Sequence, residues 1–341
     1  MQKVKSAFIL AAGKGTRLRP LTGKIPKPLL PVFHKPLITF ALDYCIALGI
    51  EKLALNTCHL HENFYNTFQV KEAEYRFRLG HYEGKQLTLF HENPILETGG
   101  ALRNARSILE QGTFLIHNAD IISDAPLQDL IDHHIQSKSM VTLLLRHDGA
   151  SKNVAYNSNS GQIEGFSGAW NSLPSLSSKN SISMVYAGIA VIEPSFLDWI
   201  PLEGPASIIP ALTKAIEHHQ KIAGFVPANN YFWSDLGTPE SYLQAHLHIA
   251  QTKWNPPYKL GEKSLPWPQA VHPLATIDPS ATLHSMVVAG ANTYIGPGVH
   301  LKNCVILPET KVDQPGEFSE IIFFKDSFFS VNKNNSPDIS Y

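Results

Sequence analysis

Two glycines and three cations stand directly behind an apolar run in FILAAGKGTRLRP, residues 8–20. Arg17 belongs to this stretch, and Lys27 follows it between two prolines. Backbone N–H groups of a glycine-rich turn can converge on a phosphate, and glycine lets the backbone approach closely. Cations beside such a turn neutralise charge that develops on a leaving pyrophosphate. We therefore expect Gly13 and Gly15, with Arg17 and Lys27, to hold a phosphate.

The three best-known phosphate loops do not fit this stretch. A Rossmann fingerprint requires a third glycine, and Leu18 follows Arg17 instead. No Walker A string occurs, and the HRD and DFG motifs of protein kinases are absent. The remaining pattern is G-x-G-T-R-L-x-P-L-T, followed by P-K-P.

Two aspartates follow β-rich runs. Asp120 comes after Thr113–His117, and Asp235 comes after Tyr231–Trp233. Each alone would be read as a surface or capping aspartate. Each is expected to lie at the carboxyl end of a strand, where open α/β sheets bind ligands.

Several apolar runs must position these side chains. Ala7–Ala12 predicts a strand buried on both faces, and Pro36–Leu48 predicts a helix that stops at Gly49. Further strands are expected at Lys52–Asn56, Leu87–His91, Thr113–His117, Val141–Leu145 and Val185–Ile192, and further helices near 99–110, 125–137, 206–220 and 239–251. This alternation predicts a doubly wound α/β fold with a mostly parallel sheet over residues 1–251. Residues 151–183 interrupt it with an expected hairpin and a polar loop.

The C-terminal part has a different pattern. Residues 252–268 contain four prolines and predict a linker. In residues 269–326 small or aliphatic side chains recur near every sixth position, which is typical of a hexapeptide left-handed β-helix. Residues 327–341 are expected to form a polar tail.

The composition narrows the class of function. With 28 Lys and Arg against 29 Asp and Glu, the net charge of −1 offers no general attraction for nucleic acid or an anionic membrane. Three distant cysteines do not suggest disulfides, and no apolar segment reaches membrane-spanning length. We expect a cytoplasmic protein. Sixteen histidines form no convincing metal-ligand set, and no nucleophile elbow occurs.

Taken in order, the motifs resemble the sugar-1-phosphate nucleotidyltransferases, or NDP-sugar pyrophosphorylases. The resemblance runs over residues 4–325 and continues after the opening loop through LETGGAL at 96–102, NAD at 118–120, YAGI at 186–189 and WSDLGTP at 233–239. It implies a Rossmann-like catalytic domain that binds a nucleoside triphosphate and a sugar 1-phosphate. A C-terminal β-helix is also common in this family.

The resemblance also implies roles for residues. Arg17 would handle the triphosphate, Lys27 the α- and sugar phosphates, and Asp120 and Asp235 would hold Mg²⁺. The expected nucleotide-binding and sugar-binding positions are Ala11, Ala12, Gly13, Gly15, Thr16, Glu92, Thr98, Gly99 and Gly188. The Glu92 carboxylate can accept hydrogen bonds from guanine, and with help from the backbone it can orient uracil. Both GTP and UTP therefore remain candidate nucleotides.

Two branches of the family compete for this chain. Residues 164–166 read Glu-Gly-Phe where many relatives have Glu-Lys-Pro, so the lysine that usually touches the sugar phosphate is missing. That absence and the LETGG turn resemble the N-acetylmuramate-1-phosphate uridylyltransferases, whereas the β-helix tail resembles the mannose-1-phosphate guanylyltransferases.

Two other functions are weighed against catalysis at this site. A non-catalytic regulatory subunit would usually lose the Gly-Thr-Arg triplet or an aspartate, and this chain keeps them. An acyltransferase site would need more β-helical coils than about three. We expect the tail to mediate homo-oligomerisation instead, because a short β-helix has an exposed end.

Overall fold

The computed structural model describes residues 4–70, 72–73, 77–149, 152–167, 180–261, 265–325 and 327–331. The chain forms two compact units, each built from two segments. The first unit contains Met1–Lys14 and Ala41–Trp233, and the second contains Gly15–Phe40 and Ser234–Tyr341. The opening loop therefore contributes residues to both units. The predicted boundaries at 251 and 268 stay a prediction.

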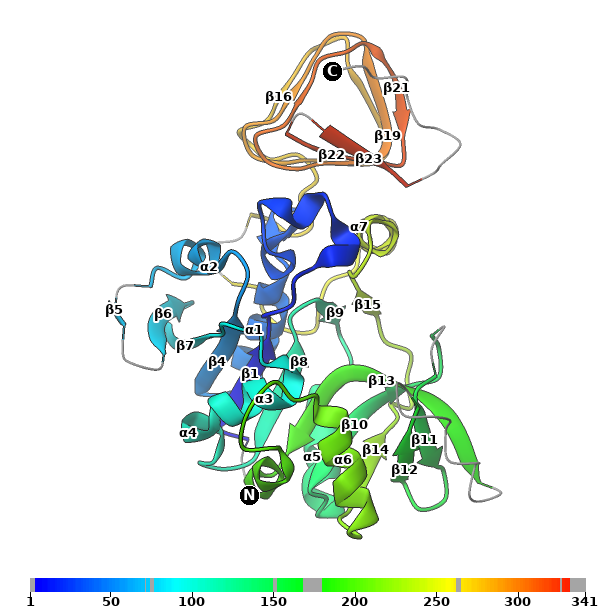
Figure 1. Ribbon diagram of the computed structural model, residues 1–341. Helices are drawn as coiled ribbons and strands as arrows, with labels where there is room; N and C mark the ends of the chain where they lie inside the picture. Colours follow the sequence, from blue (N-terminus) through cyan, green and yellow to red (C-terminus); the bar gives the residue numbers. More distant parts are fainter. Residues whose placement is uncertain are drawn as a thin grey trace. The chain divides into compact units, whose positions relative to one another are not determined.

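An eleven-stranded sheet forms the centre of the first unit (Figure 1). Its strand order is β10-β14-β12-β11-β13-β8-β1-β4-β7-β6-β5. The parallel centre consists of β8 (Phe114–Asn118), β1 (Ser6–Leu10), β4 (Lys52–Thr57) and β7 (Lys85–His91). The other strands are β5 (Glu72–Ala73), β6 (Arg78–Tyr82), β10 (Val141–Arg146), β11 (Val154–Asn157), β12 (Gln162–Phe166), β13 (Ser181–Ile192) and β14 (Ile222–Phe225).

The expectation of a mostly parallel sheet is wrong outside this centre, with the exception of β10 and β14, which pair in parallel. Strand β13 is antiparallel to β8, β10 and β11, and β6 is antiparallel to β7. The physical reason is the length of the connections, because short turns such as those joining β6 to β7 and β11 to β12 permit only antiparallel pairing. The predicted hairpin of 151–166 exists as β11 and β12, but it lies within the sheet. The predicted polar loop after it falls mostly outside the described residues.

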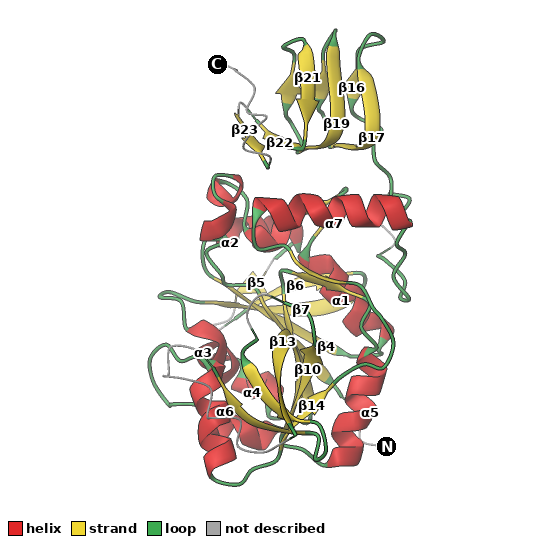
Figure 2. Cartoon of the chain, turned by 90° about the vertical axis from the view of Figure 1, so that its right-hand side faces the viewer, coloured by secondary structure: helices red, strands yellow, loops and turns green. Residues whose placement is uncertain are grey.

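Helices cover both faces of this sheet, as predicted (Figure 2). Figure 2 shows α1 (Ile38–Ala47) and α5 (Leu127–Ser137) on one face, and α3 (Glu97–Asn104), α4 (Arg106–Leu109) and α6 (Ile208–Glu217) on the other. The predicted helix at 99–110 is interrupted at Ala105. In α6 the apolar spacing places Ile208, Ala211, Leu212 and Ala215 in the core. Two further helices in the described part of this unit are α2 (His61–Thr67) and η4 (Pro194–Trp199).

The strand order reverses at β1. From β1 the chain goes to β4 on one side, and β8 pairs with β1 on the other. Ligands of open α/β folds bind at such a reversal, beyond the carboxyl ends of the strands. Ala11 follows β1 and Ala119 follows β8, and the Ala119 amide donates to the Leu10 carbonyl oxygen at 3.0 Å. Two of the predicted site segments therefore meet at the position where a ligand is expected.

The second unit begins with three short 3₁₀ turns, η1 (Thr16–Leu18), η2 (Leu21–Gly23) and η3 (Lys27–Leu29). A small hairpin of β2 (Pro31–Val32) and β3 (Lys35–Pro36) follows, and later in the chain comes α7 (Pro239–Thr252). The first residue of the expected linker at 252–268, Thr252, ends α7, and the described residues after it form no helix or strand but are fixed by aromatic contacts. Trp254 and Trp267 both pack against Phe40, with ring centroids 6.4 and 5.2 Å away.

Parallel strands wind through the C-terminal part of this unit, and in Figure 1 their path has a three-sided outline. One sheet contains β16 (Thr276–Ile277), β18 (Tyr294–Ile295) and β20 (Lys311–Val312). The other contains β17 (Thr282–Ala289), β19 (Val299–Ile306), β21 (Gly316–Ser319), β22 (Ile321–Phe324) and β23 (Ser327–Ser330). Pairing joins Thr282 to His300 and Val299 to Gly316, which are 18 and 17 residues apart.

Side chains six residues apart share the core of this part. Ala289, Ile295 and Leu301 are buried at that spacing, and so are Ile306, Val312 and Phe318. Residues 327–330, which we assigned to the polar tail, form β23 instead. The reason is that β23 pairs antiparallel with β22 and that Phe328 packs on the core. Within the described residues no helix combines the length and apolar character needed to cross a bilayer.

Candidate active site

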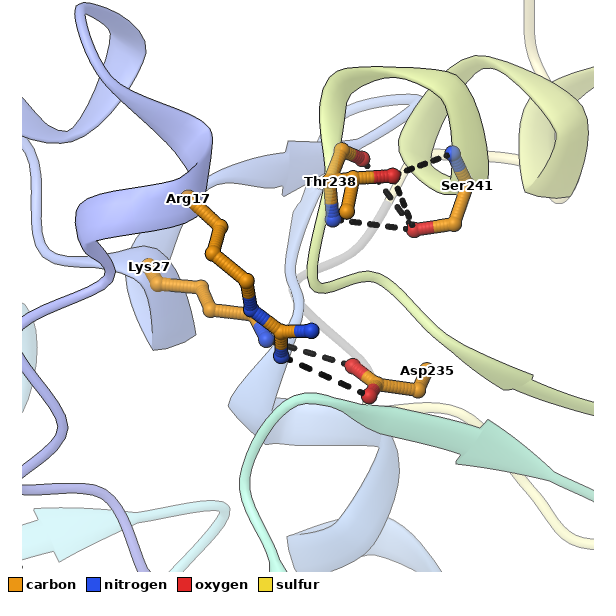
Figure 3. A network of polar contacts seen from close by, with 5 residues as sticks. All are labelled: Arg17, Lys27, Asp235, Thr238 and Ser241. Atoms are coloured by element: carbon orange, nitrogen blue, oxygen red, sulfur yellow. Dashed lines mark hydrogen bonds and ion pairs between the residues drawn. The ribbon is translucent and has the colours of Figure 1, made fainter. Parts of the chain in front are cut away.

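Two cations share one carboxylate in the second unit. Figure 3 shows the side chains of Arg17 and Lys27 directed toward Asp235. Lys27 Nζ lies 3.2 Å from Asp235 Oδ1, and an Arg17 Nη lies 4.0 Å from Oδ2. The Lys27 side chain is 9% exposed, whereas that of Arg17 is 69% exposed. The structure thus brings Asp235 to two predicted cations that precede it by more than 200 positions in the sequence, and the three side chains carry one net positive charge.

The conformation of the opening loop requires Gly15. Its φ is +61°, in the left-handed region, and a Cβ there would lie 3.0 Å from Thr22 Cγ2 and 3.1 Å from Lys27 Cβ. The Thr22 hydroxyl donates to the Gly15 carbonyl oxygen at 2.8 Å. The loop therefore folds back on itself and fixes the base of the Lys27 side chain. Thr16 begins η1, the turn that also carries Arg17.

The WSDLGTP segment has a separate structural reason for each of its last residues. A Cβ on Gly237 would lie 2.8 Å from an Arg17 Nη and 2.9 Å from Asp235 Oδ1, so any other residue here would require these two side chains to shift. Thr238 then caps α7 in a reciprocal pair with Ser241 (Figure 3), and Pro239 occupies the first turn. Sequence reasoning had not assigned Gly237 or Thr238 a role, although both stand in the quoted motif.

In the first unit a buried network holds the backbone after β1. Asn56 Oδ1 accepts from the amides of Ala11 at 2.6 Å and Ala12 at 3.3 Å. Its Nδ2 donates to Glu92 Oε1 at 2.8 Å, and Glu92 Oε2 accepts from the Leu96 amide at 2.8 Å. Asn56 was missed in the sequence because it lies inside an apolar strand. It joins three predicted nucleotide-binding residues.

Glu92, which we expected to contact the base, is only 1% exposed. Burial raises the pKa of its carboxyl group, while hydrogen bonds from Leu96 and Asn56 lower that pKa and so oppose the shift. Both carboxylate oxygens already accept a hydrogen bond. Its role in this conformation is to fix the Asn56 side chain and the start of the 96–100 turn.

We expect Asn56→Ala to destabilise the protein by about 3 kcal/mol, because it leaves two amides and a buried carboxylate oxygen without partners. Urea unfolding followed by circular dichroism measures this change. Asn66→Ala, an exposed site on α2, is the control and should change the free energy of unfolding by less than about 0.5 kcal/mol. Equal effects of the two substitutions would refute the importance of the network.

Gly188 lies on β13 against the chain that follows β8. Its φ is +75°, and a Cβ there would lie 2.6 Å from Asn118 Nδ2 and 2.5 Å from Ile121 Cδ1. Ile189 pairs with His117, so Gly188 sits beside the NAD segment that ends in Asp120. The glycine is therefore required for this close approach, and Asp120 follows in the turn between β8 and β9 (Ile121–Ser123).

Gly188→Ala should lower stability by about 2–4 kcal/mol, because it combines a left-handed backbone with a clash against a fixed side chain. Gly84→Ala is a matched control: its φ is +74°, and a Cβ there would meet nothing within 4 Å among the described atoms. The difference between the two variants in urea unfolding isolates the clash. If Gly188→Ala costs no more than Gly84→Ala, close packing at this point is not required.

The turn at 96–100 is held by contacts to the start of α6. The Thr98 hydroxyl accepts from the Ile208 amide at 2.9 Å, and the Gly100 amide donates to the Ala206 carbonyl oxygen at 2.9 Å. A Cβ on Gly99 would lie 2.9 Å from that same oxygen. Thr98 and Gly99 thus have packing roles here, and their predicted contact with a nucleotide stays a prediction.

A cavity in the first unit does not belong to the predicted site. This cavity of about 430 Å³, lined by His134, Lys138, Glu193 and Lys221 among others, lies at the amino-terminal end of β10. Ala11 and Asp120 instead follow the carboxyl ends of the parallel strands β1 and β8. No group of three or more His, Cys, Asp or Glu suited to a metal ion occurs in the described part of the chain.

Comparison with known proteins agrees with this architecture. A model of the nucleotidyl transferase family matches residues 6–252. The mannose-1-phosphate guanylyltransferase of Mycobacterium tuberculosis is 31% identical over 313 residues, which cover 90% of this chain and 81% of that protein. Mannose-1-phosphate guanylyltransferase 1 of Arabidopsis thaliana is 29% identical over 314 residues, with 90% and 82% covered.

A third relative is the mannose-1-phosphate guanylyltransferase catalytic subunit beta of Xenopus tropicalis, 29% identical over 242 residues that cover 70% of this chain and 62% of that protein. The chain belongs to the nucleotidyl transferase family. Within it, the chain is an enzyme of the sugar-1-phosphate nucleotidyltransferase class.

Proposed function

We propose that this enzyme transfers a guanylyl group from GTP to mannose 1-phosphate and releases pyrophosphate. The observation that carries the proposal is the similarity to two mannose-1-phosphate guanylyltransferases over 90% of the chain. The cation and carboxylate set of Arg17, Lys27 and Asp235 supplies the charges that such a reaction needs.

A second candidate reaction is uridylyl transfer to N-acetylmuramate 1-phosphate. It is favoured by the absence of a lysine at residues 164–166. In the structure Glu164 accepts from Asn157 Nδ2 at 2.8 Å and from the Ser181 hydroxyl. This part of β12 is therefore engaged in holding the hairpin to β13, and the sugar phosphate requires a cation from elsewhere.

The proposed mechanism needs no covalent intermediate. An oxygen of the sugar phosphate attacks the α-phosphorus of the triphosphate in line, and the bond to the pyrophosphate breaks. Because this oxygen is already anionic, no general base is required. Lys27 would bind the phosphates around the reacting phosphorus, and exposed Arg17 would bind the leaving pyrophosphate. Gly13, Gly15 and Thr16 would present backbone N–H groups to the nucleotide, and Ala11 and Ala12, whose amides donate to Asn56, would contact it through their other atoms.

Asp120 and Asp235 are the two carboxylates that we propose as ligands of Mg²⁺. Hard carboxylate oxygens suit this ion, which takes one or two of them together with phosphate oxygens and water. The proposal rests on their places in the NAD and WSDLGTP motifs. When bound, the ion would act as a Lewis acid and template for the phosphates. Asp235 must then exchange part of its interaction with Lys27 for the ion.

We further propose that residues 269–325 form a left-handed β-helix of hexapeptide repeats. The six-residue spacing of its core side chains and the 17- to 18-residue pairing offset, about three repeats per turn, support this. Self-association through this part and a cytoplasmic location stay predictions.

Pyrophosphate release from a matrix of substrates tests the proposal. GTP, UTP, ATP, CTP and dTTP are each paired with mannose, glucose, N-acetylglucosamine and N-acetylmuramate 1-phosphates in the presence of Mg²⁺. We expect the GTP and mannose 1-phosphate pair to have the highest kcat/KM. A preference for UTP with N-acetylmuramate 1-phosphate would select the second candidate. A folded protein that binds nucleotide in calorimetry but releases no pyrophosphate would support a non-catalytic subunit.

A further inference from the structure

Arg146 ends strand β10, and its guanidinium lies over an indole ring. The guanidinium carbon is 3.7 Å from the centroid of the Trp233 ring. That ring is itself held, because Trp233 Nε1 donates to the Ala187 carbonyl oxygen at 3.0 Å. Stacking of this kind fixes the plane of the guanidinium and leaves its N–H edge free to donate.

This cation has no hydrogen bond or ion pair to any residue in the described part of the chain. Burial lowers the pKa of the guanidinium below its ordinary value, and the ionisable side chains of Tyr231 and Asp148, neither of them within ion-pair distance, oppose this shift. Half-buried arginines usually satisfy their donors with a carboxylate or phosphate, because an unpaired buried charge is costly. The guanidinium of Arg146 is therefore available to bind an anion.

The location of Arg146 relates it to the sugar side of the candidate site. Arg146 pairs with Val185 on β13, three residues before Gly188. Ala187, which holds the Trp233 ring, directly precedes Gly188, the position that touches Asn118. Since β10 ends at the same edge of the sheet as β8, Arg146 and the NAD segment open toward the same side. All of these residues belong to the first unit.

We propose that Arg146 binds an anionic group of the sugar 1-phosphate. It would supply the positive charge of the lysine that many relatives have where this chain has Gly165. The inference rests on the proposed sugar-1-phosphate nucleotidyl transfer and names a substrate-binding residue for it. Two groups of such substrates are oxyanions that a guanidinium binds. One is the phosphate common to all sugar 1-phosphates, and the other is a carboxylate carried only by an acidic sugar such as N-acetylmuramate.

Steady-state kinetics of Arg146→Gln and Arg146→Lys test the inference. We expect Arg146→Gln to raise KM for the sugar 1-phosphate by about 10- to 100-fold, with KM for the nucleotide within about twofold of wild type. Arg146→Lys should recover part of the lost affinity for the sugar 1-phosphate, since it restores the positive charge but not the planar array of N–H donors of a guanidinium. Arg106→Gln, which removes an exposed cation of the same unit, is the matched control and should leave both constants unchanged.

The choice of sugar separates the two sources. A similar rise for mannose and N-acetylmuramate 1-phosphates assigns Arg146 to the phosphate, and a rise for the acidic sugar alone assigns it to the carboxylate. Unchanged KM values for both sugars, in a variant that melts like wild type, would overturn the inference.

If wild type releases no pyrophosphate, the proposed function fails. Calorimetry of both sugar phosphates with a non-hydrolysable nucleotide then decides on Arg146, and equal or absent binding in wild type and Arg146→Gln would overturn it.

Discussion

Lys27→Met is expected to lower kcat by about 10²- to 10³-fold. Lys27 is the most enclosed cation of the candidate site, with a side chain only 9% exposed and Nζ 3.2 Å from Asp235. In such a setting a positive charge acts on developing phosphate charge with little screening by water, and removing one such group typically costs this much. Pyrophosphate release at saturating substrates measures the effect.

The controls separate catalysis from folding. Lys24→Met removes an exposed cation three residues earlier and should keep near-normal kcat. Lys27→Arg retains the charge with a different shape, so we expect partial activity. Because Asp235 is 38% exposed, the loss of its partner should cost little stability. A Lys27→Met enzyme with turnover within a few fold of wild type would remove Lys27 from the mechanism.

Asp235→Asn should lower turnover by about 100-fold and shift the Mg²⁺ dependence to higher concentrations. The substitution preserves shape but removes the negative charge that the ion needs, and 100-fold corresponds to about 3 kcal/mol of transition-state stabilisation. The measurement is kcat as a function of free Mg²⁺. For wild type we also expect that chelation by EDTA stops the reaction and that added Mg²⁺ restores it.

Asp313→Asn provides the comparison. Asp313 is a partly exposed carboxylate of the same unit that also pairs with a lysine, Lys311, at 2.6 Å. Its loss should leave the Mg²⁺ curve in place. If Asp235→Asn and wild type have superimposable Mg²⁺ curves, Asp235 does not bind the ion, and its role reduces to positioning Lys27 and Arg17.

Apolar periodicity and turn residues made most of the first unit predictable. β1, β4, β7, β8 and β10 and helices α1, α5 and α6 lie within a few residues of their expected positions, and so does α7 in the second unit. The direction of strand pairing could not be predicted in the same way. It depends on which strands neighbour β13, and residues far apart in the sequence determine that. The strand at 327–330 was missed because only two phenylalanines, Phe328 and Phe329, mark it.

The candidate site was predictable where a motif carried it. Arg17, Lys27 and Asp235 were chosen for their charge and their flanking glycines and prolines, and the structure brings them together. Asn56 and Arg146 carried no such signal, since each lies within or at the end of an apolar strand. Only the paired strands show that Asn56 reaches the Ala11 and Glu92 segments, or that Arg146 meets a tryptophan 87 residues later.

The most direct test of the account is to follow the α-phosphorus of the nucleotide. GTP labelled at that position is incubated with mannose 1-phosphate, Mg²⁺ and the wild-type enzyme, and the products are separated. Direct transfer predicts that the label appears in a sugar nucleotide, with one pyrophosphate released for each labelled product and no reaction without the sugar phosphate. Label recovered only as free nucleoside monophosphate, or retained covalently on the protein in the absence of the sugar phosphate, would contradict it.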